Sequence, residues 1–179
     1  MAFYLALEDC TGQQVAELWL GHRDRSYIMA DGGYCPVFQQ VAWCWECRTF
    51  VAAEKLRDLS EIDADEAQAR KEHGWFQDTL RGPNDVQPWL MKNTEFLFAE
   101  QLAGYARQRA WRRSRQSPPR CLECGSTRIE PMPRDLTNIR HPLTGMTLKL
   151  KNVCHASMAI HLLYTPEGER HVSREAPGT

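Results

Sequence analysis

The sequence lacks the long apolar segment that a membrane-spanning helix requires. No stretch of the chain approaches about 20 consecutive apolar residues. The first residues read MAFYLALEDC, with no basic start and an apolar run that ends at Glu8, unlike a secretory signal peptide. We therefore expect a cytoplasmic protein, in a compartment that keeps thiols reduced.

The sequence also lacks an excess of charge of one sign and lacks common catalytic motifs. The formal net charge of −1 over 179 residues provides no overall attraction to nucleic acid or to an anionic membrane. No G-x-S-x-G, Walker-loop or H-E-x-x-H pattern occurs. The composition, 42% hydrophobic and 25% charged, is typical of a globular domain. We expect residues 1–179 to form a single domain without enzymatic activity.

Cysteine occurs in a pattern that indicates metal binding or redox chemistry. The chain has seven cysteines, and an odd number fits poorly with a framework of paired disulfides. Cys44 and Cys47 form a C-x-x-C pair in AWCWECRTF, and Cys121 and Cys124 form a second pair in CLECGS. This spacing occurs both in dithiol redox sites and in halves of zinc sites.

A zinc site would use both pairs. Two thiolates at this spacing bind one ion when the chain turns tightly between them and backbone N–H groups point at the sulfur atoms. Gly125, just after the second pair, has the backbone freedom that such a turn needs. Four thiolates satisfy the tetrahedral preference of zinc and leave no open position. We predict one structural Zn²⁺ ion, bound by Cys44, Cys47, Cys121 and Cys124.

The motifs CWEC and CLECG together resemble the paired knuckles of zinc-ribbon proteins. The resemblance covers the cysteine pairs and the β-rich segments beside them, and it implies that the four cysteines share one zinc ion. Two features depart from the family pattern. Arg48 follows the first knuckle in place of glycine, and residues 48–120 separate the knuckles, where ~15–20 residues are usual. Because loop-closure cost grows slowly with length, we interpret 48–120 as a mainly helical insertion.

A C-x-x-C thiol oxidoreductase is an alternative, since WCWEC also matches the W-C-x-x-C form of thioredoxin-like sites. Those sites need a helix directly after the cysteine pair. The segment RTFVAA, which places Thr49, Phe50 and Val51 together, is a poor helix start. A redox fold would also leave CLECGS unexplained. Buried cysteines without a ligand are a third interpretation.

The apolar periodicity predicts an α+β fold, in which a small zinc-pinned antiparallel sheet carries a helical insertion between the two knuckles. Alternating residues predict strands over 2–8, 37–43, 147–153 and 158–164. Residues 15–21 fit either a strand or a short helical turn. We expect a loop over 30–36 and a disordered tail over 173–179.

Two helices are predicted within the insertion. The first covers 60–74, from Ser60 to Gly74, and the second covers 93–119, with Asn93 or Thr94 as its N-cap. Residues 81–89, RGPNDVQPW, are predicted to form a turn-rich connector.

Other cysteine and histidine residues have weaker claims to a role. Cys35 or His141 could replace one ligand in a Cys₃His variant, but a small buried side chain and a turn residue are the simpler interpretations. Cys154 and His155 are adjacent in a predicted strand, so their side chains point to opposite faces and do not form a nucleophile–base pair. Cys10 receives no role.

A basic run over 107–120 combines arginines with an aromatic residue, which suits phosphate contact and base stacking. The candidate nucleic-acid ligands are Arg107, Arg109, Arg112, Arg113 and Arg115. Cations near a helix C-terminus also complement the helix dipole, and the acidic segment 54–72 is a candidate partner for them. We favour this second interpretation.

The expected function is therefore that of a non-enzymatic, zinc-stabilised binding protein of the adaptor, inhibitor or toxin-neutralising type, which acts through contacts with a protein partner. The first alternative is a nucleic-acid-binding zinc-ribbon protein that uses the arginine-rich run 107–120. The thiol oxidoreductase is the second alternative.

Overall fold

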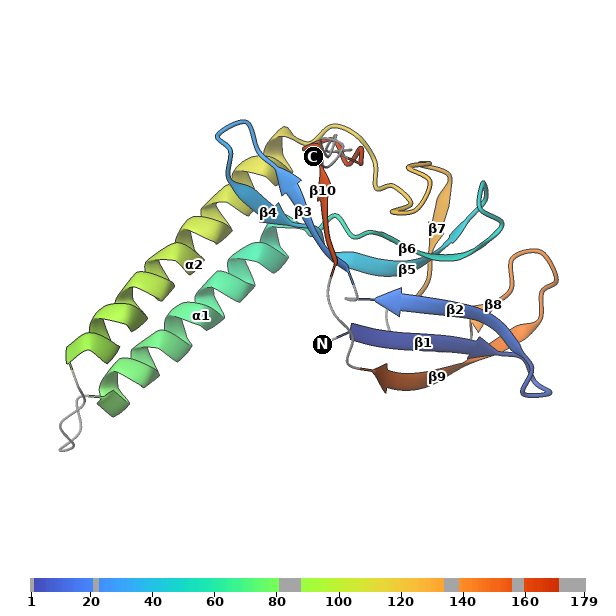
Figure 1. Ribbon diagram of the computed structural model, residues 1–179, viewed down its shortest axis with the longest axis horizontal. Helices are drawn as coiled ribbons and strands as arrows, with labels where there is room; N and C mark the ends of the chain where they lie inside the picture. Colours follow the sequence, from blue (N-terminus) through green and yellow to red (C-terminus); the bar gives the residue numbers. More distant parts are fainter. Residues whose placement is uncertain (1, 21–22, 81–87, 134–138, 156–159, 171–179) are drawn as a thin grey trace, which may run out of the picture. The chain divides into compact units, whose positions relative to one another are not determined.

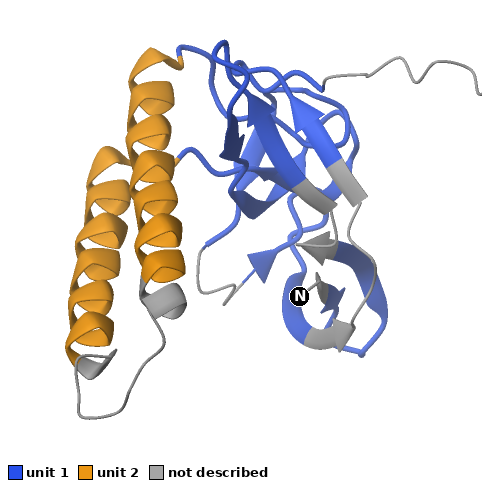
Figure 2. Ribbon diagram, turned by 60° about the vertical axis from the view of Figure 1, so that its left-hand side comes forward, with its two compact units in different colours: residues 1–56, 116–179 blue, residues 57–115 orange. Residues whose placement is uncertain are grey.

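The chain folds into two compact units in the computed structural model (Figure 1; Figure 2). The structure describes residues 2–20, 23–80, 88–133, 139–155 and 160–170. The β unit contains residues 1–56 and 116–179, and the helical unit contains residues 57–115. The fold class is α+β as predicted, with the helices between the two cysteine pairs in sequence. The expectation of a single domain stays a prediction. The tail 173–179 lies outside the described residues.

The first sheet of the β unit has the order β2-β1-β9-β8 and is antiparallel throughout. Its strands are β1 (Ala2–Glu8), β2 (Gln14–Leu20), β8 (Ile139–Arg140) and β9 (Thr147–His155). Residues 15–21 are thus mainly strand, and the helical-turn alternative is wrong. A tight turn joins β1 to β2, in which the Asp9 carboxylate accepts the Thr11 backbone N–H at 2.8 Å.

A second sheet, β6-β5-β7, carries the first cysteine pair. It contains β5 (Gln39–Cys44), β6 (Thr49–Glu54) and β7 (Ile129–Pro131). Trp43 and Phe50 are directly opposite each other on β5 and β6 and are both buried. They pack with Leu5, Leu7 and Leu148 of the first sheet in one apolar cluster. The two sheets therefore share a core, which fixes the strand that ends at Cys44.

The third sheet has the order β10-β3-β4, from β10 (Ile160–Tyr164), β3 (Arg23–Ile28) and β4 (Tyr34–Pro36). The predicted loop over 30–36 is wrong in its last three residues, which pair with β3. Gly32 has a positive φ of 76° and forms the turn with Met29, so the chain reverses before Tyr34 and closes a hairpin. β10 lies parallel to β3 and brings Tyr164 beside Tyr27.

The helical unit is a pair of antiparallel helices, α1 (Leu59–Leu80) and α2 (Pro88–Ser114) (Figure 1). Both predicted helices exist, but their bounds differ. α2 begins at Pro88, before the predicted cap, because proline is well tolerated in the first turn of a helix. It ends at Ser114, four residues before Pro118, and Ser117, directly before this proline, disfavours helical geometry.

The first helix continues through Gly74 to Leu80, beyond its predicted end. Gln77, in this added stretch, donates a hydrogen bond to Glu95 of α2 at 2.8 Å. Contact with α2 offsets the helical cost of glycine, about 1 kcal/mol. The predicted connector 81–89 lies outside the described residues up to 87, and its last two residues belong to α2. No helix among the described residues has the length and apolar character needed to cross a membrane.

Candidate metal centre

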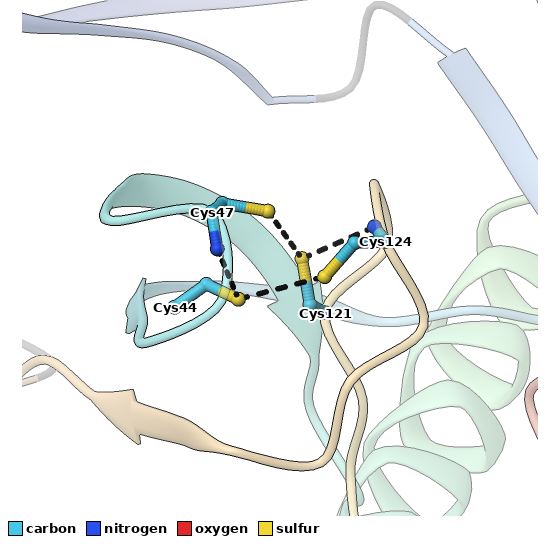
Figure 3. Close-up of side chains that lie close together, drawn as sticks. All are labelled: Cys44, Cys47, Cys121 and Cys124. Carbon is cyan, nitrogen blue, oxygen red and sulfur yellow. Dashed lines mark hydrogen bonds between the residues drawn. The ribbon is translucent and has the colours of Figure 1, made fainter.

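The two C-x-x-C pairs come together in the β unit (Figure 3). Cys44 ends β5 and Cys47 lies in the turn before β6. Cys121 lies beside β6 through a bridge to Ala53, and Cys124 follows in the same loop. All four sulfur atoms lie within 4.8 Å of one another. These four cysteines could therefore hold a metal ion, as their spacing predicted.

Two of the distances between sulfur atoms match the edges of a tetrahedral thiolate site. The Sγ atoms of Cys44 and Cys124 are 3.6 Å apart, and those of Cys47 and Cys121 are 3.9 Å apart. A zinc ion with Zn–S bonds of about 2.3 Å requires tetrahedral S···S edges of about 3.8 Å. A disulfide would bring two sulfur atoms to about 2.05 Å. The arrangement thus fits four ligands around one ion.

Both knuckles use the same backbone turn. The Cys47 N–H points at the Cys44 sulfur at 3.4 Å, and the Cys124 N–H points at the Cys121 sulfur at 3.5 Å. The next residue adopts a positive φ in each knuckle, 75° at Gly125 and 55° at Arg48. Arg48 therefore takes the conformation that glycine favours, and its departure from the family pattern does not change the turn.

Strand pairing closes the sequence gap between the knuckles. Cys47 and Cys121 are 74 positions apart in sequence. Leu122 N–H donates to the Ala52 carbonyl at 3.0 Å, and Trp45 N–H donates to the Arg128 carbonyl at 3.0 Å. β7 also pairs with β5, with Ile129 opposite Cys44. The insertion thus leaves and re-enters a continuous β framework, which holds the second pair against the first.

Burial and hydrogen bonds shift the pKa values of Cys47, Cys121 and Cys124. Cys44 and Cys121 are buried, whereas Cys124 is exposed. Burial raises the pKa of Cys121 to about 11, and burial together with the adjacent thiols raises the pKa of Cys47 strongly. For Cys124 burial acts upward, but the Ser126 backbone N–H and the neighbouring thiols outweigh it and lower the pKa. A bound cation would favour the thiolate form of all four cysteines.

A buried arginine holds the second knuckle from the third sheet. The Arg25 side chain on β3 is 1% exposed and donates to Glu123 Oε1 at 3.1 Å, Gln39 Oε1 at 2.7 Å and Tyr164 Oη at 3.1 Å. The Tyr164 hydroxyl in turn donates to the Leu122 carbonyl at 3.4 Å. Leu122 and Glu123 are the two residues between the cysteines of this knuckle, so Arg25 and Tyr164 fix its shape.

A second buried polar contact supports the same loop. Glu54 at the end of β6 is fully buried. Its carboxylate accepts the Tyr27 hydroxyl at 2.9 Å and the Arg120 backbone N–H, one residue before Cys121, also at 2.9 Å. The sequence alone does not indicate a role for Arg25, Tyr27 or Glu54, because their partners are distant in sequence and no local motif marks them.

The other candidate ligands are separate from the four sulfurs. Cys35 is a buried residue of β4. His141 Nδ1 accepts the backbone N–H groups of Leu143 and Thr144 at 3.2 and 3.3 Å, and its ring packs against Trp43. The simpler interpretations of Cys35 and His141 are thus confirmed. Cys10 is exposed. The side chains of 154–155 lie outside the described residues.

Several arginines of the basic run are engaged within the helical unit. Arg109 pairs with Glu66 and with Asp63, the latter at 3.3 Å. Arg112 donates to the Arg57 carbonyl at 3.0 Å. The Arg115 guanidinium lies 5.6 Å from the Trp111 ring centroid. The predicted contact between the acidic segment and the basic helix end is confirmed for Arg109. Arg107 is half-buried and Arg113 is exposed.

Comparisons with known proteins provide no family for this chain. No protein-family model, no curated protein and no solved structure matches it. The resemblance to zinc-ribbon proteins therefore rests on the two cysteine pairs and on the clustering of their sulfur atoms.

Proposed function

We propose that this chain is a non-enzymatic binding protein, in which one structural zinc ion stabilises the β unit and the helical unit contacts a protein partner. The four-sulfur cluster carries the first part of the proposal. Thiolate-only tetrahedral sites select zinc or iron among the common metals. Zinc suits a purely structural role because it has no redox chemistry, and four protein ligands leave it no position for a substrate.

The positions of the sulfur atoms argue against a thiol oxidoreductase that uses Cys44 and Cys47. A redox C-x-x-C site needs an accessible attacking thiolate. Cys44 is fully buried, and burial raises the pKa of Cys47. Each of these two sulfurs also has a close neighbour in the other pair, at 3.6 and 3.9 Å. These distances support one group of four ligands.

Exposed apolar side chains on the helical unit support the second part of the proposal. Trp75 is 70% exposed, and Phe96 and Leu97 are each 65% exposed. Exposed apolar side chains that lie together mark interaction surfaces, and Trp75 and Leu97 line the same groove between α1 and α2. The contacts that engage Arg109 and Arg112 inside the helical unit make nucleic acid the weaker partner class. We therefore favour a protein partner.

Site-specific photocrosslinking in cells of the source organism tests the binding role. A photoreactive phenylalanine analogue at Leu97 should yield a discrete adduct with another protein. The same analogue at Asp78, exposed on α1 and outside the apolar surface, is the matched control. If Leu97 produces no adduct, or the same adducts as Asp78, the proposed binding role is wrong.

A further inference from the structure

The two helices form an apolar groove of about 530 Å³ within the helical unit. Its apolar lining consists of Ala69, Trp75 and Phe76 from α1 and Leu97 and Phe98 from α2. A groove of this size accommodates several large side chains.

The wall of the groove is ordered by contacts between the helices. The His73 and Phe98 rings stack with centroids 3.7 Å apart and an interplanar angle of 3°. His73 Nε2 lies 3.6 Å from Glu95 Oε2, and Gln77 donates to the same carboxylate at 2.8 Å. The groove is therefore formed before a ligand binds, which lowers the ordering cost of binding.

The charge along the groove is negative. Glu72 lines it, and no lysine or arginine does so among the described residues. The Glu72 carboxylate accepts a hydrogen bond from the neutral amide of Gln68 at 2.7 Å, which leaves its charge in place. By helical spacing, exposed Glu100, three residues after Leu97, and exposed Lys71, four residues before Trp75, flank the groove with opposite charges, so Glu72 sets the sign of the charge in the lining. A ligand with basic groups beside an apolar stripe complements this surface.

We propose that this groove binds an amphipathic helix of another protein, with apolar side chains in the groove and lysine or arginine along its flanks. This inference rests on the proposed binding function and specifies the partner. Helix-in-groove recognition uses apolar anchors at i, i+3, i+4 and i+7. A second copy of the chain fits less well, because a two-fold interface brings the same patch from both copies together. The Glu72 carboxylate of each copy would then enter the interface without a lysine or arginine among the described lining residues to pair with it.

Three synthetic peptides of about 18 residues test the proposal, a length sufficient for a helix. All share one leucine face, and their flanks carry lysine, glutamine or glutamate. Fluorescence anisotropy with the full-length protein should show Kd rising from the lysine to the glutamate peptide by about tenfold at low salt. The difference should shrink as salt screens the charges.

Variants locate the binding site. Leu97→Asp should abolish binding of the lysine peptide, because it places a charge among the anchors. Glu72→Gln should reduce the preference for lysine over glutamate by about threefold, as expected for exposed charge pairs. Asp78→Asn removes a carboxylate from the same helix outside the groove and should leave the preference unchanged. Circular dichroism verifies that each variant remains helical.

Four outcomes would overturn the proposal. The glutamate peptide binds as tightly as the lysine peptide, or no peptide binds at tens of micromolar. The protein dimerises in sedimentation experiments and Leu97→Asp abolishes the dimer, which identifies a second copy as the occupant. Peptide binds only after deletion of residues 171–179, which identifies the chain's own terminus. If peptides fail while Leu97 still crosslinks to a protein, the binding function stands and only the basic-helix partner is wrong.

Discussion

Replacement of Arg25 by alanine should weaken metal retention, because Arg25 holds the loop between two ligands. Its effect on the metal is therefore indirect and acts through the position of this loop. The variant loses hydrogen bonds to Glu123, Gln39 and Tyr164. A hydrogen bond to a charged group contributes about 1.5–3 kcal/mol, but the three share one side chain and are not additive. Glu123 is 46% exposed and regains hydration after the change. We therefore expect a loss of about 3 kcal/mol of folding free energy.

The effect on the metal should exceed what destabilisation alone explains. Residues that orient metal ligands typically change affinity by about 10–100-fold when removed. Competition with a chromophoric chelator, measured below the unfolding temperature, reports this affinity directly. Tyr164→Phe should produce a smaller effect in the same direction, since it removes only the hydroxyl that contacts the Leu122 carbonyl.

A matched core variant separates positioning from stability. Leu148→Ala removes a buried side chain from the shared core of the first two sheets and should cost about 2–5 kcal/mol. It should leave chelator competition close to wild type. If Arg25→Ala retains zinc like the wild type, or if Leu148→Ala loses it equally, then Arg25 does not position the knuckle.

Three further changes have defined outcomes. Cys47→Ser and Cys121→Ser should cause equal loss of metal and similar falls in Tm, since each removes one of four shared ligands; retention of metal by one of them would show that the pairs bind separately. Glu66→Gln should destabilise the helical unit at pH 7 but not in acid. Hydrogen bonds from Arg109 and Arg70 lower the Glu66 pKa below 4.5, so the stabilisation by the Glu66 carboxylate is present above pH 4.5 and is lost as the pH falls through its lowered pKa. An equal effect at both pH values would contradict this role of the ionised carboxylate. Replacement of Arg112 and Arg113 by glutamine should lower stability modestly, and neither the wild type nor the variant should bind nucleic acid. A gel shift of the wild type that weakens with salt, and whose salt dependence is smaller in the variant, would favour the nucleic-acid alternative.

The cysteine cluster could be predicted from sequence because its chemistry is local. Two thiols separated by two residues restrict the backbone between them, and the second pair supplies what one pair lacks. The clustering of the four sulfurs agrees with that prediction across 74 positions of sequence. Strands with clear alternation, such as β1, were predictable for the same reason, since period-two patterning is also local.

Features that depend on distant partners were not predictable. Arg25 and Glu123 are 98 positions apart, and nothing near Arg25 in sequence indicates a buried cation. β4 follows a glycine-rich turn and has only three residues, so its strand character comes from pairing with β3. α2 starts at Pro88 and not at the predicted cap, because the capping pattern at Asn93 competes with a proline that suits a first turn.

Zinc K-edge X-ray absorption of protein purified without chelator or affinity metal tests the central claim most directly. We expect stoichiometric zinc with a first shell of four sulfur atoms at about 2.3 Å. The same spectrum should change in Cys121→Ser, because one sulfur ligand is lost. Protein that is folded but lacks zinc, or a zinc shell that contains nitrogen or oxygen in place of one or more sulfurs, would contradict the four-cysteine site.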